Sequence, residues 1–201
     1  MKAMMTQSPE EISKFLSLVL RHQPELIGLR LNAEGWADIN ELIAKAAEKN
    51  IVLSHELICS VVQTNDKQRF RLTADRACIR ANQGHSIPVA LNLPEQVPPP
   101  CLFHGTASRF LPSIREKGLL PGARQHVHLS ADAATALQVG SRHGKPVVLQ
   151  IDAARMYQAG CKFFLSENNV WLVDAVPSPC ILFDESPPFP KSSSGPEQGA
   201  G

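Results

Sequence analysis

Leu93-Pro94-Glu95-Gln96-Val97-Pro98-Pro99-Pro100-Cys101 is the stretch that decides how this chain of 201 residues is organised. Four prolines lie between positions 94 and 100, and proline fixes the backbone and removes a hydrogen-bond donor. Such a segment is typical of a stiff, extended connector. We therefore expect two modules, residues 8–92 and residues 101–183, joined by a linker over residues 93–100.

The last segment, residues 184–201, has a different composition. It is rich in Pro, Ser and Gly and holds a single aromatic residue, too little apolar surface to offset the entropy of ordering. We expect a disordered tail there. No apolar run in the chain exceeds four residues, so we expect no membrane span and no secretory signal.

Charge and cysteine content narrow the possible functions. The chain has 20 Lys and Arg against 19 Asp and Glu, a net charge of +1, so a polyanion would have to be bound by a local cluster of cations. No two of the five cysteines lie closer than 19 residues. This spacing argues against a zinc ribbon, a C-x-x-C pair and a disulfide scaffold. It favours free thiols in a reducing cytoplasm.

The part before the connector carries three helix starts. Ser8-Pro9-Glu10-Glu11 is a capping box with proline at the first helical position, and Pro24 ends that helix. Asp38 and Ser54 are further caps. An alternating edge strand, Q-R-F-R-L-T, and a short strand near residues 77–81 follow. Three helices and a hairpin predict a winged-helix module.

The part after the connector alternates short strands with short helices. The strand candidates are C-L-F-H-G-T, H-V-H-L-S, P-V-V-L-Q-I-D, K-F-F-L, N-V-W-L-V-D-A-V and C-I-L-F. Helices are expected over residues 108–117, after Asp132 and from Ala153. This order predicts an α+β fold. No G-x-G-x-x-G follows a strand, which argues against a Rossmann domain.

Two basic segments in the first part are candidate phosphate sites. Arg21-His22 ends the first helix, where two cations could simply complement the helix C-terminus or could clamp a phosphate. Residues 66–80 hold five Lys or Arg and two Asp, a local charge of +3. This run is either a solvated hairpin face or a basic surface that contacts a phosphate backbone.

The second part has three polar motifs. His104-Gly105-Thr106 reads as a turn glycine and a capping threonine after a strand. Arg124, His126, His128 and Ser130 fall on one strand face; zinc binding is disfavoured because no Cys or carboxylate completes a ligand set. Glu167 lies in a polar turn and is either a catalytic carboxylate or part of a hairpin connection.

Together, the motifs L-R-H-Q-P, D-K-Q-R-F, R-A-N-Q-G-H-S, F-H-G-T, R-Q-H-V-H-L-S and N-V-W-L, in this order, resemble the RNA 2′-phosphotransferases over about residues 12–183. The resemblance implies a winged-helix RNA lobe and an ADP-ribosyltransferase-like NAD lobe. It also implies a reaction in two steps. An internal RNA 2′-phosphate displaces nicotinamide from NAD, and a ribose hydroxyl then attacks the phosphorus. The products are 2′-hydroxyl RNA and ADP-ribose 1″,2″-cyclic phosphate.

Site residues follow from the resemblance, position by position. It assigns phosphate binding and catalysis to Arg21, His22, Arg69 and Arg124. It assigns NAD binding to His104, Gly105, Thr106, His128, Ser130 and Val170. The RNA contacts are expected from Lys14, Arg71, Arg80, Gln83 and His85. It implies a monomer that needs no metal, and it leaves Glu167 without a role.

Two other functions use the same residues differently. An ADP-ribosyltransferase acting on a nucleic-acid phosphate end or on a protein would share the NAD site but leave ADP-ribose on its acceptor. A non-catalytic winged-helix binder would have no use for His104 and His128.

Overall fold

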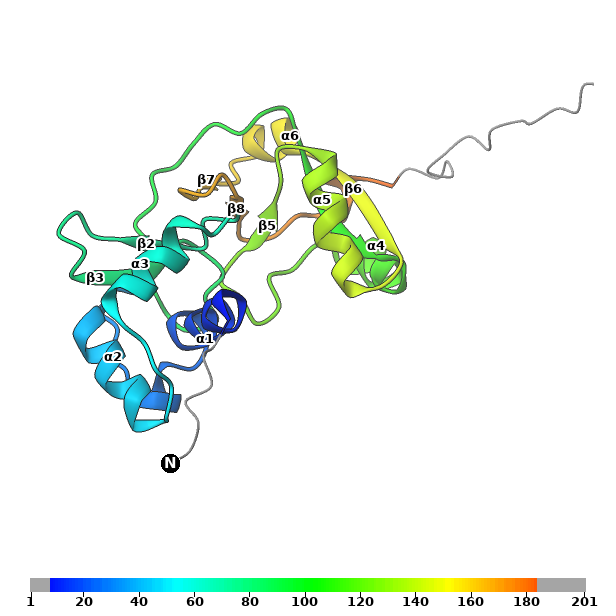
Figure 1. Ribbon diagram of the computed structural model, residues 1–201. Coiled ribbons are helices and arrows are strands. Elements are labelled where there is room, and N and C mark those ends of the chain that lie inside the picture. Colours follow the sequence, from blue (N-terminus) through cyan, green and yellow to red (C-terminus); the bar gives the residue numbers. More distant parts are fainter. Residues whose placement is uncertain (1–7, 184–201) are drawn as a thin grey trace, which may run out of the picture.

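The computed structural model describes residues 8–183 and shows a mixed α and β chain built on small antiparallel sheets (Figure 1). The predicted α+β class is therefore confirmed. The predicted tail over residues 184–201 lies outside the described residues. Within residues 8–183, every helix is too short or too polar to cross a bilayer.

The first elements surround one three-stranded sheet of order β1-β3-β2. Side-chain caps begin the helices as predicted: Ser8 accepts the Glu11 N–H, Asp38 the Glu41 N–H and Ser54 the Leu57 N–H. The elements are α1 (Pro9–Arg21), η1 (Pro24–Ile27), β1 (Ala37–Asp38), α2 (Ile39–Glu48), α3 (His55–Gln63), β2 (Phe70–Leu72) and β3 (Cys78–Ala81).

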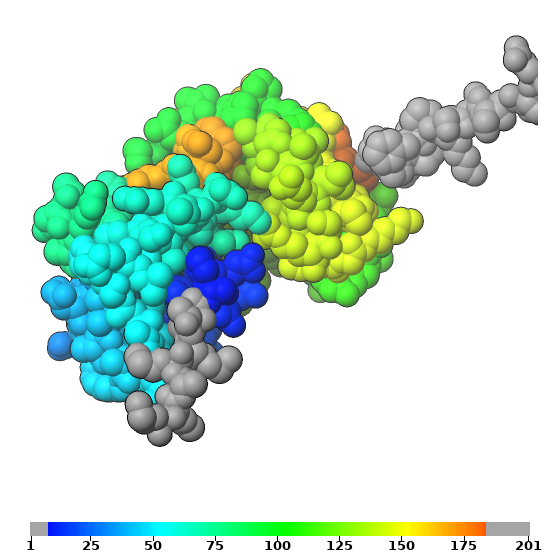
Figure 2. All heavy atoms as spheres, viewed as in Figure 1, coloured from blue at the N-terminus to red at the C-terminus, as the bar shows by residue number. Residues whose placement is uncertain are grey.

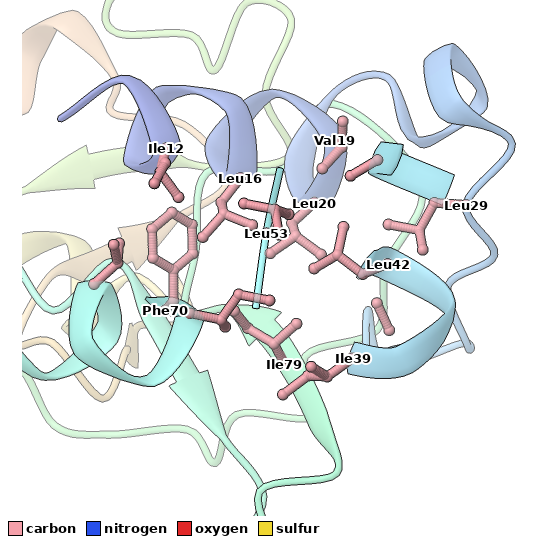
Figure 3. Packing of buried hydrophobic residues seen from close by; sticks show 14 of the residues in the cluster. Ile12, Leu16, Val19, Leu20, Leu29, Ile39, Leu42, Leu53, Phe70 and Ile79 are labelled. Carbon is pink, nitrogen blue, oxygen red and sulfur yellow. The ribbon is translucent and has the colours of Figure 1, made fainter. Parts of the chain in front are cut away.

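A first hydrophobic core lies between α1 and this sheet (Figure 3). The apolar face of α1, which includes Ile12, Leu16 and Leu20, points toward Phe70 of β2 and Ile79 of β3. All three helix residues are fully buried. This packing fixes the end of α1, where Arg21 and His22 follow the last buried turn.

The later elements form two further three-stranded sheets, β4-β6-β9 and β5-β8-β7. Phe103 and Ser130 exchange backbone hydrogen bonds of 2.9 and 2.8 Å and so join β4 to β5. The elements are β4 (Cys101–Ala107), η2 (Ser108–Phe110), α4 (Leu111–Lys117), β5 (Val127–Leu129), α5 (Ala133–Gly140), η3 (Ser141–His143), β6 (Pro146–Asp152), α6 (Ala153–Gln158), β7 (Phe164–Leu165), β8 (Trp171–Val173), η4 (Ser178–Cys180) and β9 (Ile181–Leu182).

A second hydrophobic core lies within these elements and is built around Leu102, Leu149, Ile151 and Phe163. The motif His104-Gly105-Thr106 borders it and lies inside β4, so the turn expected at Gly105 is wrong. A Cβ atom on Gly105 would lie 1.7 Å from the Ala136 carbonyl oxygen of α5. Glycine is needed there because the backbones of strand and helix touch.

The two groups of elements meet along one side of the molecule. In Figure 2 the surface of α1 (dark blue) lies beside that of the chain near residue 140 (yellow-green). In Figure 1, β7 and β8 lie close to β2 and α3. The candidate site lies where these groups face each other.

Candidate functional site

Arg21 and His22 are held by the loop that follows β3. The Ser86 N–H donates to the Arg21 carbonyl at 2.9 Å, and the Ser86 hydroxyl is hydrogen-bonded to His22 Nδ1 at 2.9 Å. Gly84, with φ of +88°, lies against the Arg21 guanidinium. Arg21 and His22 are thus fixed by a loop more than sixty residues away in sequence. Two residues that only complemented the end of a helix would not need such contacts.

Arg69 is presented by a loop that two asparagines hold in place. Asn65 Oδ1 accepts the Arg69 N–H at 3.5 Å, and the Asn82 N–H donates to the Arg69 carbonyl at 2.9 Å. Arg21 Nη2 donates to the same carbonyl at 3.3 Å. This bond from the Arg21 side chain holds its guanidinium against the Arg69 backbone, although the two residues are far apart in sequence.

Arg124 and His128 form the facing group. Arg124 Nη1 lies 3.3 Å from His128 Nδ1, and because a guanidinium only donates, Nδ1 accepts. The proton of neutral His128 is then on Nε2, which is buried without a partner. His104 Nδ1 donates to the His128 carbonyl at 3.0 Å, which leaves His104 Nε2 as an acceptor.

The pKa values show that these groups share one electrostatic environment. Burial, with the charges of Arg69 and Arg124, lowers the pKa of Arg21 to about 10. Burial and the charges of Arg21 and Arg124 also lower the pKa of His22. The neighbours that act on both groups are all cationic. Holding like charges together in a half-buried site is unfavourable unless an anion neutralises them.

The structure thus brings together the four residues predicted to bind phosphate. Arg21, His22 and Arg69 come from the elements before the connector, and Arg124 comes from those after it. The Gln125 N–H donates to the His85 carbonyl at 3.1 Å. This hydrogen bond ties the chain next to Arg124 to the loop that supports Arg21.

Sequence reasoning missed Arg142, which η3 places close to Arg69 and Lys67. Its charge lowers the pKa of both groups, after burial in each case. The short basic run Ser141-Arg142-His143-Gly144-Lys145 was the available signal. Only the packing of α5 and η3 on β4 shows that it faces the cluster.

A pocket of 700 Å³ lies beside the cluster, between α1 and the loop after α3. Its lining includes the predicted RNA contact Lys14 together with Ser17, His22, Lys67 and Arg69. Lys14, Lys67 and Arg69 therefore border one concave surface, which Glu10 and Asp66 also line. A second pocket, of 440 Å³, lies on the other side of this loop and reaches Arg71 and Glu167.

The other residues predicted to contact RNA differ in their exposure to solvent. Arg71 is exposed and Gln83 is half-buried. Arg80 and His85 are buried, at 7% and 1% exposure. Arg80 lies over the Trp36 ring at 4.7 Å, and His85 has both ring nitrogens buried without a partner. Both side chains point into the protein, so neither belongs to an exposed basic surface, and the RNA contact expected of them stays a prediction.

The predicted NAD residues line the junction of β4 and β5. His104 and His128 lie there with their pKa values lowered, that of His128 to about 3, mainly by burial. Gly105 and Thr106 are buried in β4, and Ser130 forms the backbone bridge to Phe103. Val170 lies apart from them, at the end of the β7–β8 turn and immediately before β8. Within residues 8–183, no three His, Cys, Asp or Glu side chains group as metal ligands.

Comparison with known proteins identifies the family of the chain. The sequence profile of the family described as RNA 2′-phosphotransferase, Tpt1 / KptA family, matches residues 7–175. A probable RNA 2′-phosphotransferase of Acaryochloris marina is 58% identical over 174 residues, which cover 87% of this chain and 96% of the relative. One from Hahella chejuensis is 57% identical, covering 87% and 95%. One from Pseudomonas aeruginosa is 59% identical, covering 84% and 93%. The chain therefore belongs to the RNA 2′-phosphotransferase family.

Proposed function

We propose that this protein transfers an internal 2′-phosphate from RNA to NAD, with release of nicotinamide and ADP-ribose 1″,2″-cyclic phosphate. The observation that carries the proposal is the convergence of Arg21, His22, Arg69 and Arg124, each with a pKa lowered by burial. A phosphate dianion is the ligand that such a cluster favours, because guanidinium groups match its oxygens in pairs.

The cluster would act on the phosphate in two ways. Before reaction it holds the dianion in one orientation, which removes much of the entropic part of the barrier. During phosphoryl transfer, negative charge grows on the equatorial oxygens, and fixed guanidinium groups stabilise it without reorganisation. The guanidinium groups of Arg21, Arg69 and Arg124 would thus both bind the phosphate and stabilise the charge that grows on it during transfer.

The junction of β4 and β5 fits the co-substrate NAD. His128 offers a buried N–H without a partner, and His104 offers an unprotonated Nε2, as its Nδ1 bond shows. One donor and one acceptor suit vicinal ribose hydroxyls, which both donate and accept. NAD supplies an anomeric carbon with nicotinamide as the leaving group. The residues of this chain would orient NAD, with the neutral imidazoles of His104 and His128 beside it.

The resemblance places Val170 where many protein-modifying ADP-ribosyltransferases have a catalytic Glu, and an apolar residue there suits a phosphate nucleophile. An anionic phosphate needs no general base, so an apolar residue at this place costs the reaction nothing. His22, whose pKa is lowered by burial and by Arg21 and Arg124, is neutral near pH 7. It can accept a proton from the attacking ribose hydroxyl in the second step.

We further propose that residues 8–92 form a winged-helix lobe for RNA and residues 101–183 an ADP-ribosyltransferase-like lobe for NAD, joined by the connector. Two separate hydrophobic cores support this division. Lys14, Lys67 and Arg69 along the 700 Å³ pocket would direct the RNA backbone toward the cluster. Five free cysteines suit a monomer that works in the reducing cytoplasm.

One incubation tests the proposal. The protein is mixed with NAD and an oligoribonucleotide that carries one internal 2′-phosphate, and the products are identified by mass spectrometry. We expect 2′-hydroxyl RNA, nicotinamide and a free cyclic ADP-ribose phosphate. The same RNA without the 2′-phosphate is the control and should not consume NAD.

Two other outcomes would replace the proposal. ADP-ribose that remains attached to the RNA or to protein would identify an ADP-ribosyltransferase. RNA binding with no consumption of NAD would identify a non-catalytic binder.

A further inference from the structure

The turn between β7 and β8 reaches across to the sheet of the first core. The Glu167 carboxylate pairs with Arg71 of β2, and its Oε1 lies 3.5 Å from Arg80 Nη2 of β3. Arg71 and Arg80 are direct cross-strand partners. A single carboxylate from the second group of elements therefore bridges two guanidinium groups of the first.

The turn that carries Glu167 is held rigidly by its own residues. Ser166 is 2% exposed, and its hydroxyl oxygen accepts the Val170 N–H at 3.0 Å. The neighbouring Asn168 donates from Nδ2 to the Lys67 carbonyl at 3.0 Å. Glu167 and Asn168 thus make adjacent contacts with the other part of the molecule, and Lys67 is two positions before Arg69.

The Arg80 contact carries more weight than the Arg71 contact. The side chains of Arg71 and Glu167 are 44% and 41% exposed, and ion pairs of this exposure contribute little. The Arg80 side chain is only 9% exposed, and its Nε has no partner. Arg80 stacks on Trp36 at 4.7 Å, and the negative charge of Glu34 also favours its charged form. Glu167 is the carboxylate within ion-pair distance of its guanidinium. Removal of one member of such a pair leaves a buried charge, which is strongly unfavourable.

The candidate site depends on this contact for its geometry. Arg21, His22 and Arg69 belong to the first group of elements, and Arg124 and His128 belong to the second. The Glu167 turn makes one polar contact between the groups, and the bond from Gln125 N–H to the His85 carbonyl makes another. We therefore expect a change at either contact to shift Arg124 relative to Arg21.

We propose that Glu167 is a positioning residue: through Arg80 and Arg71 it holds the two parts of the protein in the arrangement that closes the phosphate site. This role in the reaction rests on the proposed function. It explains a carboxylate near a phosphate-binding cluster, because Glu167 is neutralised by two guanidinium groups and does not repel the substrate.

The experiment compares Glu167→Gln and Glu167→Ala with the parent and with Glu48→Gln. Glu48 is the matched control, since it forms an exposed ion pair with Lys45 at 2.9 Å inside α2. Hydrogen exchange at the Gln125 amide is measured first, because it reports the contact between the two parts without reference to activity. We expect both Glu167 variants to exchange this amide about tenfold faster or more, the scale of one charge-assisted hydrogen bond. Exchange within the two cores should not change.

Kinetics with 2′-phosphorylated RNA form the second readout. We expect kcat to fall by about 10- to 100-fold in Glu167→Ala, the scale of a displacement of about 1 Å at a reacting group. The KM for RNA should change less than kcat, and Glu48→Gln should match the parent in both measurements. Glu167→Gln keeps the side-chain volume and serves if the alanine variant does not fold.

Each result decides the proposal. If the Gln125 amide exchanges in both Glu167 variants at the same rate as in the parent, the positioning role of Glu167 is overturned, whether or not activity falls. If the Gln125 amide exchanges faster but kcat equals that of the parent, Glu167 joins the two parts without affecting the reaction, and its role in catalysis is overturned. If the parent itself does not turn over this RNA, the proposed function fails, and the exchange data still decide whether Glu167 joins the two parts.

Discussion

At the scale of single residues, Arg69 and Arg124 come from different parts of the chain, and after burial the charges of both lower the pKa of Arg21. In the proposed function each contacts the bound phosphate. We expect Arg69→Ala and Arg124→Ala to lower activity by about 10²-fold or more, the scale of removing one preorganised charge donor. Single-turnover conversion of a 2′-phosphorylated oligonucleotide measures this. Arg30→Ala, which changes an exposed ion pair with Glu41, is the control. Parental turnover by either cluster variant would contradict the phosphate assignment.

His85 makes stability depend on pH. Burial, with the charges of Arg21, His22 and Arg80, lowers its pKa to about 4, against about 6.5 in an unfolded chain. Between these values the unfolded chain binds a proton that the folded protein does not. The folded state therefore loses stability as pH falls from about 6.5 to 4, by up to about 1.4 kcal/mol per pH unit for this residue.

The variant His85→Gln tests this dependence. We expect its free energy of unfolding to depend less on pH between 6.5 and 4, by about one proton. Urea unfolding at several pH values measures the slope. An unchanged slope would show that His85 is not the group responsible, whatever the variant does to stability at pH 7.

At the scale of elements, local signals predicted the helices and most strands. Ser8, Asp38, Ser54 and Asp132 each cap the helix expected after them, because capping involves residues only three positions apart. The two-residue strand β1 was not predicted. It exists because Ala37 and Asp38 pair with Ile79 and Cys78 of β3, a contact between distant segments that no short pattern encodes.

The contact of α5 with β4 makes Gly105 hard to replace. A Cβ atom there would meet the backbone of α5, which cannot move aside as a side chain can. We expect Gly105→Ala to lower the free energy of unfolding by about 3 kcal/mol, the upper end for overpacking. Urea unfolding measures it, with Ala134→Ser on the exposed face of α5 as the control. A loss of less than about 0.5 kcal/mol, the usual range for surface changes, would show that strand and helix are not in close contact.

At the scale of the whole molecule, the cations around the cluster come from both parts, and the proposed function places RNA against them. Arg142 lies close to Lys67 and Arg69, whereas the charge of Arg71 is already neutralised by Glu167. We expect Arg142→Ala and Lys67→Ala each to reduce the slope of log Kd against log salt by about 0.7, the value per phosphate for single strands. Arg71→Ala should reduce it less.

Titration of a fluorescent 2′-phosphorylated RNA at several salt concentrations gives these slopes. Lys49→Ala, at the end of α2, is the control and should leave the slope unchanged. A larger change for Arg71→Ala than for Arg142→Ala would place the RNA over the β2–β3 hairpin instead of beside η3.

The sequence by itself determined the helix starts and most of the strands, and the resemblance of its motifs predicted which residues bind phosphate. These features follow from short spacings or from residue types that one chemistry requires. Only the tertiary structure decided that Arg142 joins the cluster, that Arg80 and His85 are buried, and that Glu167 spans the two parts. Each of these depends on how elements distant in the chain pack together, and side-chain spacing along one segment carries no information about that packing.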